Sequence, residues 1–196
     1  MPSLRISVDG TVVASVCTDG FDSLSARISG TRIDEELAAL DVAGGSYPND
    51  AESTYLTWTD LPLHPGQVVL VEFIDSEPTT HNGKTIEELA EGEPPMSIVD
   101  IKPTAAMFEQ LRSTPRVRDK FSLRLGSSFG QYFVGETGPD DHGFSFSVHW
   151  DSFHPERARL SLHSYTLDGL ENHKPMSNFV EERMSVGNSV HFQLDA

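Results

Sequence analysis

The chain has 196 residues, with 30 acidic against 14 basic side chains and a formal net charge of −16. Because nucleic-acid binding needs a concentrated basic face, this balance argues against DNA or RNA as a direct partner. The single cysteine, Cys17, excludes an intramolecular disulfide and cysteine-based zinc sites. No apolar run approaches the ~18 residues that cross a bilayer, and residues 1–8 do not resemble a signal peptide, so we expect a cytoplasmic protein.

Alternating apolar and polar residues predict β-strands through the first part of the chain. Leu4, Ile6 and Val8 share one face, and a second strand over 12–16 follows the turn residues Asp9-Gly10, which is typical of a hairpin. Further strands are predicted over 24–29, 55–59 and 68–74. The segment 34–42 resembles a helix when taken alone, but its counterpart 158–162 alternates as a strand. We therefore predict a strand over 38–43, with Gly44-Gly45 as the turn that follows.

The second part of the chain repeats this style. Its predicted strands cover 121–125, 131–134, 144–150, 158–165 and 189–194. Short helices are predicted over 85–90 and over 104–112, where Thr104 can cap the helix and Pro115 ends it. A third short helix is predicted over 178–184 from Asn178 and Glu181.

The two halves can be aligned in the same order with an offset of about 117 to 123 residues. Leu4-Ile6-Val8 falls on Phe121-Leu123-Leu125, Gly20-Phe21 on Gly143-Phe144, and 63–73 on 184–194. The sequence therefore predicts a mostly β fold with a few short helices, built from two diverged copies of a small antiparallel module. The copies form either a sandwich or sheets covered by helices. The predicted divisions are an acidic module over 1–76, a linker over 77–97 and a second module over 98–196.

The negative charge is concentrated in the first half. Residues 1–95 carry 17 acids and 4 bases, whereas residues 96–196 carry 13 acids and 10 bases. Such an excess speeds association with a basic partner, although it also simply keeps a small protein soluble. The candidate partner-binding residues are Asp34, Glu35, Glu36, Asp41, Asp50, Glu52 and Asp60.

Motifs for chemistry are weak in this sequence. The segment 126–130 reads as a turn between strands rather than a nucleophile elbow, and no phosphate loop or dinucleotide fingerprint occurs. We therefore expect no catalytic site, no metal and no cofactor. An enzyme would need His149, Asp151, His154 and His163 to converge in one pocket.

Two further features leave alternatives open. Five of the 14 basic residues lie within 13 positions, and they could hold the acidic copy, bind an anionic partner or face solvent. They are Arg112, Arg116, Arg118, Lys120 and Arg124. Four aromatic residues are candidate interface anchors if they face away from the core, although most should be core residues. They are Tyr55, Trp58, Trp150 and Phe153.

Charge and the lack of a reactive motif together predict a non-catalytic protein-binding module. Its concrete form would be a bacterial immunity or antitoxin-type inhibitor that covers a basic toxin, with no direct contact to nucleic acid or membrane. The main alternative is a structural or assembly subunit of a phage-like or secretion particle, which would self-associate through sheet edges into homo-oligomers.

Overall fold

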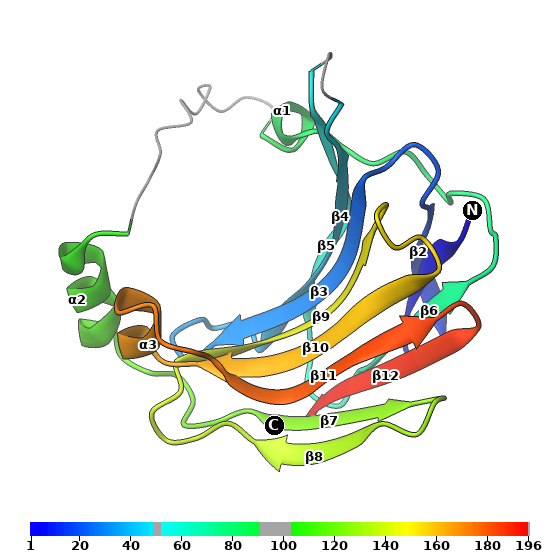
Figure 1. Cartoon of the computed structure of the whole chain (residues 1–196). Helices are drawn as coiled ribbons and strands as arrows, with labels where there is room; N and C mark the ends of the chain where they lie inside the picture. Colours follow the sequence, from blue (N-terminus) through cyan, green and yellow to red (C-terminus); the bar gives the residue numbers. More distant parts are fainter. Residues whose placement is uncertain (49–51, 91–102, 196) are drawn as a thin grey trace.

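The computed structural model of the protein describes residues 1–48, 52–90 and 103–195. Within these residues the chain forms two six-stranded antiparallel sheets, which pack face to face, and three short helices (Figure 1). The mostly β prediction is confirmed, and of the two predicted arrangements the sandwich is the one that forms. Sheet B is strongly bent and sheet A lies against its convex side, so the outer side of sheet B is concave (Figure 1).

Sheet A has the strand order β2-β1-β6-β12-β7-β8. Its strands are β1 (Ser3–Val8), β2 (Thr11–Cys17), β6 (Val68–Ile74), β7 (Ser122–Ser127), β8 (Tyr132–Glu136) and β12 (Asn188–Asp195). Sheet B has the order β11-β10-β9-β3-β4-β5. Its strands are β3 (Ser23–Thr31), β4 (Ala38–Ser46), β5 (Thr54–Leu63), β9 (Gly143–Asp151), β10 (Arg157–Tyr165) and β11 (Ser177–Ser185).

The strand order repeats the internal duplication of the sequence. In sheet A the trio β2-β1-β6 meets the trio β12-β7-β8, and in sheet B β5-β4-β3 meets β9-β10-β11. Each strand of the first half thus has an equivalent in the second half, six positions later in chain order. The halves join where β6 pairs with β12 and where β3 pairs with β9, both antiparallel. Each half therefore contributes three strands to each sheet. The parts of the predicted linker and second module that cover 91–102 lie outside the described residues.

Two β-bulges at equivalent places reinforce this repeat. The pairing register shifts by one residue between β4 and β5, and again between β10 and β11. The extra residue is Trp58 in the first half and Phe179 in the second, and both rings pack against the core. Trp58 meets Phe21 edge to face at 5.2 Å between ring centroids, and Phe179 stacks on Phe133 at 4.9 Å. A bulge lets an edge strand turn a large side chain inward without losing its pairing.

The structure corrects the alignment of the halves near their starts. Leu4 pairs with Phe73, and Leu123 pairs with Leu194 in the equivalent strands, so Leu4 corresponds to Leu123 rather than to Phe121. The predicted match was wrong by two residues. An error of two leaves every side chain on its own face of a strand, so the alternation alone could not reveal it.

The core lies between the two sheets and is filled by the alternate residues of both. Phe146 of sheet B stacks on Phe192 of sheet A, with ring centroids 4.7 Å apart. Phe121 meets Phe144 edge to face at 4.8 Å. All four rings are at most 1% exposed. Because no disulfide is available, this apolar contact between the sheets carries the stability of the sandwich.

Two predictions about local structure were wrong. Gly44-Gly45 does not form a turn but lies inside β4, where a Cβ on Gly44 would stand 2.6 Å from the carbonyl oxygen of Ser23. The glycine is there because the neighbouring backbone approaches closely. The predicted helix over 178–184 is part of strand β11, whose residues pair with β10 over its length. Tertiary pairing overrides the local capping pattern there.

The other predicted helices are confirmed. α1 (Ile86–Leu89) begins after Thr85, which forms a capping box with Glu88, and α2 (Ala105–Ser113) begins after Thr104. The sequence analysis missed α3 (Leu167–Glu171), whose cap is Thr166. It is only five residues long and has no buried residue, so it shows no hydrophobic periodicity.

The chain between β6 and α1 covers strand edges of the first half. Thr80 exchanges hydrogen bonds with the backbone of Ser15 in β2, and the Thr79 hydroxyl accepts one from the Cys17 amide. Lys84 then pairs with Thr57 of β5 through two backbone hydrogen bonds. An uncovered edge strand is a template for unwanted pairing, so these contacts protect the first half.

Among the described residues, no helix combines the length and the apolar character that crossing a bilayer requires.

Replacing a core ring should show how much the sandwich depends on this packing. Phe192→Ala should lower the free energy of unfolding by about 3–5 kcal/mol, because it leaves a cavity between two sheets that share no covalent link. Urea unfolding followed by tryptophan fluorescence measures this. The control Phe153→Ala removes a ring that is 88% exposed and should change stability little. Equal losses in the two variants would contradict this account of the core.

Candidate functional site

The outer, concave face of sheet B carries the most concentrated set of polar side chains on regular structure. Its residues alternate with core residues along each strand, and strand pairing aligns them in two adjacent rows. The first row contains Asp60, Asp41, Arg27, Ser147, Ser161 and Glu181. The second row contains Thr57, Ala43, Ser25, His149, Arg159 and Arg183. The Ser147 and Ser161 hydroxyls lie 2.9 Å apart and are hydrogen-bonded, which shows how closely neighbouring strands bring these groups together.

The predicted partner-binding residues gather at the first-half end of this face. Asp41 and Asp60 lie directly opposite each other on β4 and β5. Asp34, Glu35 and Glu36 are exposed in the loop between β3 and β4. We call these five residues the acidic rim. Glu52 is also exposed, but it lies just before β5 at the far end of the hairpin. Asp50 lies outside the described residues.

The loop and the face enclose a shallow hollow. It has a volume of about 430 Å³ and is lined by Ser29, Gly30, Thr31, Asp34, Glu35, Glu36, Ala38 and Ala39. Small side chains form its floor, and the carboxylates lie in the loop above it. The Thr31 hydroxyl donates to a carboxylate oxygen of Asp34 at 2.7 Å, which fixes the start of the loop. The hollow therefore offers carboxylate oxygens and exposed backbone beside a floor of small residues.

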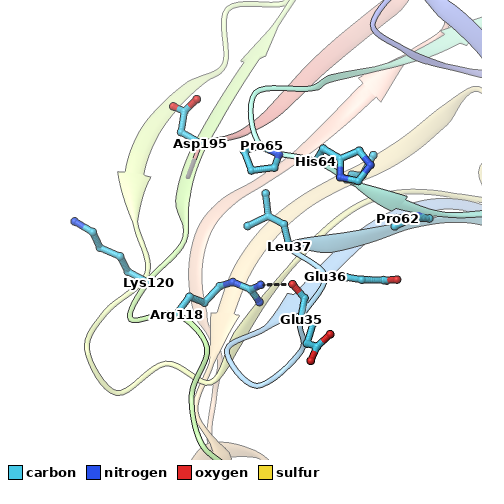
Figure 2. A pocket seen from close by; sticks show the side chains of 10 residues that line it. Glu35, Glu36, Leu37, Pro62, His64, Pro65, Arg118, Lys120 and Asp195 are labelled. Carbon is cyan, nitrogen blue, oxygen red and sulfur yellow. Dashed lines mark hydrogen bonds between the residues drawn. The ribbon is translucent and has the colours of Figure 1, made fainter.

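A second hollow lies on the other side of the same loop (Figure 2). It has a volume of about 550 Å³, and its lining includes Leu37, Pro65 and Lys120. Arg118 holds the loop there, because its guanidinium donates to the carbonyl oxygens of Glu35 at 3.0 Å and of Thr31 at 2.7 Å. A residue of the basic cluster thus positions the acidic loop through backbone oxygens, and the Glu35 and Glu36 carboxylates remain available.

The other members of the basic cluster also bind within the chain. Arg112 contacts Glu171 of α3, Lys120 lies 2.7 Å from Glu136, and Arg124 lies 2.6 Å from Asp195. Arg116 donates to a backbone carbonyl at 3.4 Å. Of the readings left open for this cluster, contacts inside the chain account for all five side chains.

The acidic rim contrasts with this cluster. Among the described residues, none of the five rim carboxylates lies within 4 Å of a basic side chain; the ion pairs are formed by other acids. Burial and the neighbouring Asp60 raise the pKa of Asp41, and Arg27 opposes them only in part. Like charges directly opposite on a sheet are destabilising. The rim is thus an electrostatically unfavourable arrangement that a cationic group would relieve.

The second-half end of the face is basic. A hollow of about 210 Å³ lies there, lined by His149, Asp151, His154, Arg157, Ala158, Arg159 and Arg183. Three of the four residues predicted for a histidine and aspartate site therefore meet, and His154 Nδ1 lies 3.2 Å from Asp151. His163 does not join them, because it lies four residues, or about 13 Å, along β10 from Arg159. Within the described residues, no three His, Cys, Asp or Glu side chains are grouped so as to hold a metal ion.

The half-buried histidines of this face share one electrostatic tendency. Burial lowers the pKa of His149, and Arg159 lowers it further, while Asp151 opposes the change. Burial also lowers the pKa of His163, helped by Arg27. Both imidazoles are therefore neutral at pH 7 and can each donate one hydrogen bond and accept another.

Sequence reasoning missed the arginines of this hollow for a specific reason. The alternation of Arg157, Arg159, Ser161 and His163 along a predicted strand does place four polar groups on one face. Arg183 could not be placed beside them, because its segment was predicted to be helical. Correct assignment of β11 would have brought Arg159 and Arg183 together.

The four candidate anchor residues divide evenly. Trp58 and Trp150 are buried in the core, at 7% and 0% exposure. Tyr55 and Phe153 are 53% and 88% exposed. Tyr55 is opposite Gly45 on the β4–β5 hairpin, and Phe153 lies in the loop next to His154. Each exposed ring thus flanks one end of the outer face. The segment 126–130 forms the predicted turn, between β7 and β8.

Comparisons of the chain with protein-family models, with curated proteins and with solved structures find no match.

The raised pKa of Asp41 yields a test of the rim. An aspartate whose pKa is raised by folding binds its proton more tightly in the folded state, so its charge destabilises the fold above that pKa. The cost disappears below the pKa of unfolded aspartate, about 3.9. Asp41→Asn should therefore raise the free energy of unfolding at pH 7 by about 0.5 kcal/mol and give no gain near pH 3.

Urea unfolding at a series of pH values measures this difference. The control Asp75→Asn removes an exposed carboxylate outside the rim and changes the net charge equally. A gain for Asp41→Asn that persists unchanged at pH 3, or one matched by Asp75→Asn, would contradict the electrostatic account.

Proposed function

We propose that this protein is a non-catalytic binding protein whose acidic rim holds a basic region of a partner protein. Its concrete form is an immunity or antitoxin-type inhibitor, acting in the bacterial cytoplasm, that covers the basic surface of a toxin. The observation that carries the proposal is that the five rim carboxylates have no ion-pair partner among the described residues, although nine ion pairs form elsewhere.

The support from geometry is that these carboxylates lie on a defined surface. Asp41 and Asp60 are fixed on paired strands, and Arg118 holds the loop that carries the other three. A partner therefore meets preordered groups, and little conformational entropy is lost on binding. The like-charge contact between Asp41 and Asp60 also favours a partner that brings a cation to this place.

The support from charge concerns the rate of encounter. A net charge of −16 attracts a basic partner over several ångströms and aligns it with the most negative surface. An inhibitor of a toxin must act before the toxin reaches its substrate, so rapid association is the property that matters. Such steering falls steeply as salt screens the charges.

A rim variant tests this proposal directly. Replacing Glu35, Glu36 and Asp60 by lysine should slow association with the partner by about tenfold or more, because all three side chains are exposed and none supports the core. The partner is first recovered from the source cells on the immobilised wild-type protein and identified. Its binding rates are then measured by surface plasmon resonance at low and high salt.

The matched control replaces Asp19, Asp75 and Asp140 by lysine, which makes the same change in net charge at exposed sites outside the rim. This variant should retain most of the wild-type association rate. Equal slowing in both variants, or a wild-type rate that ignores salt, would contradict the proposal.

A further inference from the structure

The hollow at the second-half end of the outer face combines positive groups that have few partners of their own. His149, Arg159 and Arg183 lie in one line across β9, β10 and β11, each opposite the next. Neighbouring strands stand about 4.8 Å apart, so the two arginine side chains start side by side. Both are exposed, and among the described residues neither makes a side-chain hydrogen bond or an ion pair within 4 Å.

This arrangement is unusual in so acidic a protein. The chain has more than two carboxylates for each basic residue, yet two arginines stand next to each other without one. Like charges directly opposite on a sheet cost stability, and the sequence offers many acids that could have relieved the cost. The pair is thus open to an anion from solution.

The remaining groups of the hollow leave it positive. Arg157 adds a third guanidinium on the same face, two residues from Arg159, and its only ion-pair contact in the described part of the chain is Glu156 at 3.9 Å. Asp151 is the one carboxylate in the lining, and His154 lies against it at 3.2 Å. Three arginines therefore face one lining carboxylate that already has a neighbour.

The geometry suits an anion with several oxygens and more than one charge. Each guanidinium presents a planar fork of N–H donors that binds two oxygens of a phosphate at once. A volume of about 210 Å³ accepts a phosphate group together with a few waters, which occupy roughly 30 Å³ each. A carboxylate would bring only one charge to a site with an excess of two.

We propose that Arg157, Arg159 and Arg183, with His149 at the end of their row, form a binding site for a dianionic phosphate monoester group. The site is independent of the acidic rim, because it uses different strands and the opposite charge. His149 contributes as a neutral hydrogen-bond donor rather than as a cation. Phe153, exposed in the neighbouring loop, gives the bound group an apolar surface to contact on one side.

Isothermal titration calorimetry of the full chain with phenyl phosphate tests the site, with benzoate as the comparison ligand. Phenyl phosphate should bind saturably with one site per chain, and benzoate should bind about tenfold more weakly or worse, because it carries one charge and two oxygens. Inorganic phosphate should compete for the same site. The absence of saturable binding by phenyl phosphate, or equal affinity for benzoate, would overturn the proposal.

Two variants and one control assign the binding to these residues. Replacing Arg159 and Arg183 by glutamine should weaken phenyl phosphate binding by about tenfold or more. Arg159→Lys, which keeps the charge but loses the fork, should cause a smaller loss. The control pair Lys120→Gln and Arg124→Gln removes the same charge from the other sheet and should retain wild-type affinity. Equal weakening by the control pair would show general charge attraction instead of a site and would overturn the assignment.

Discussion

The antiparallel pairing of β3 with β9 and of β6 with β12 is the interaction on which the structure depends. These two ladders lie at the centres of the two sheets and join the halves of the chain. Without them each half would be two three-stranded sheets with open central edges and too small a core to be stable. With them, the apolar faces form one continuous layer in which Phe146 of one half lies against Phe192 in the other sheet.

The same pairing explains why charge is divided on the outer face of sheet B. The strands of the acidic half supply one side of that face and the strands of the more basic half supply the other, and they meet at β3 and β9. An imbalance in composition between the halves of the sequence therefore becomes an imbalance between the two sides of one surface. The acidic rim and the arginine hollow are the two ends of that surface, and Arg27 and Ser147 face each other between them.

Much of the fold could be predicted from alternation and glycine turns, because a sandwich with one solvent face imposes a period of two on nearly every strand. The duplication even identified 38–43 as a strand against its local helical character. What failed were positions set by neighbours in space. Gly44 sits in a strand because Ser23 approaches it, and Asn178 begins no helix because β10 pairs with its segment. The rim residues were named from charge, whereas the arginine hollow needs cross-strand pairing that no local pattern contains.

The interlocked halves also bear on how such a chain could arise. A polypeptide carrying only one half would expose the inner edges of two strands, and a second copy of itself offers matching edges related by twofold symmetry. That ancestor would build the same sandwich as a homodimer, folded only at concentrations where the subunits associate. Fusing two copies removes this dependence on concentration. It also frees each half to change its surface separately, so opposite charges could arise at positions that symmetry would otherwise keep identical.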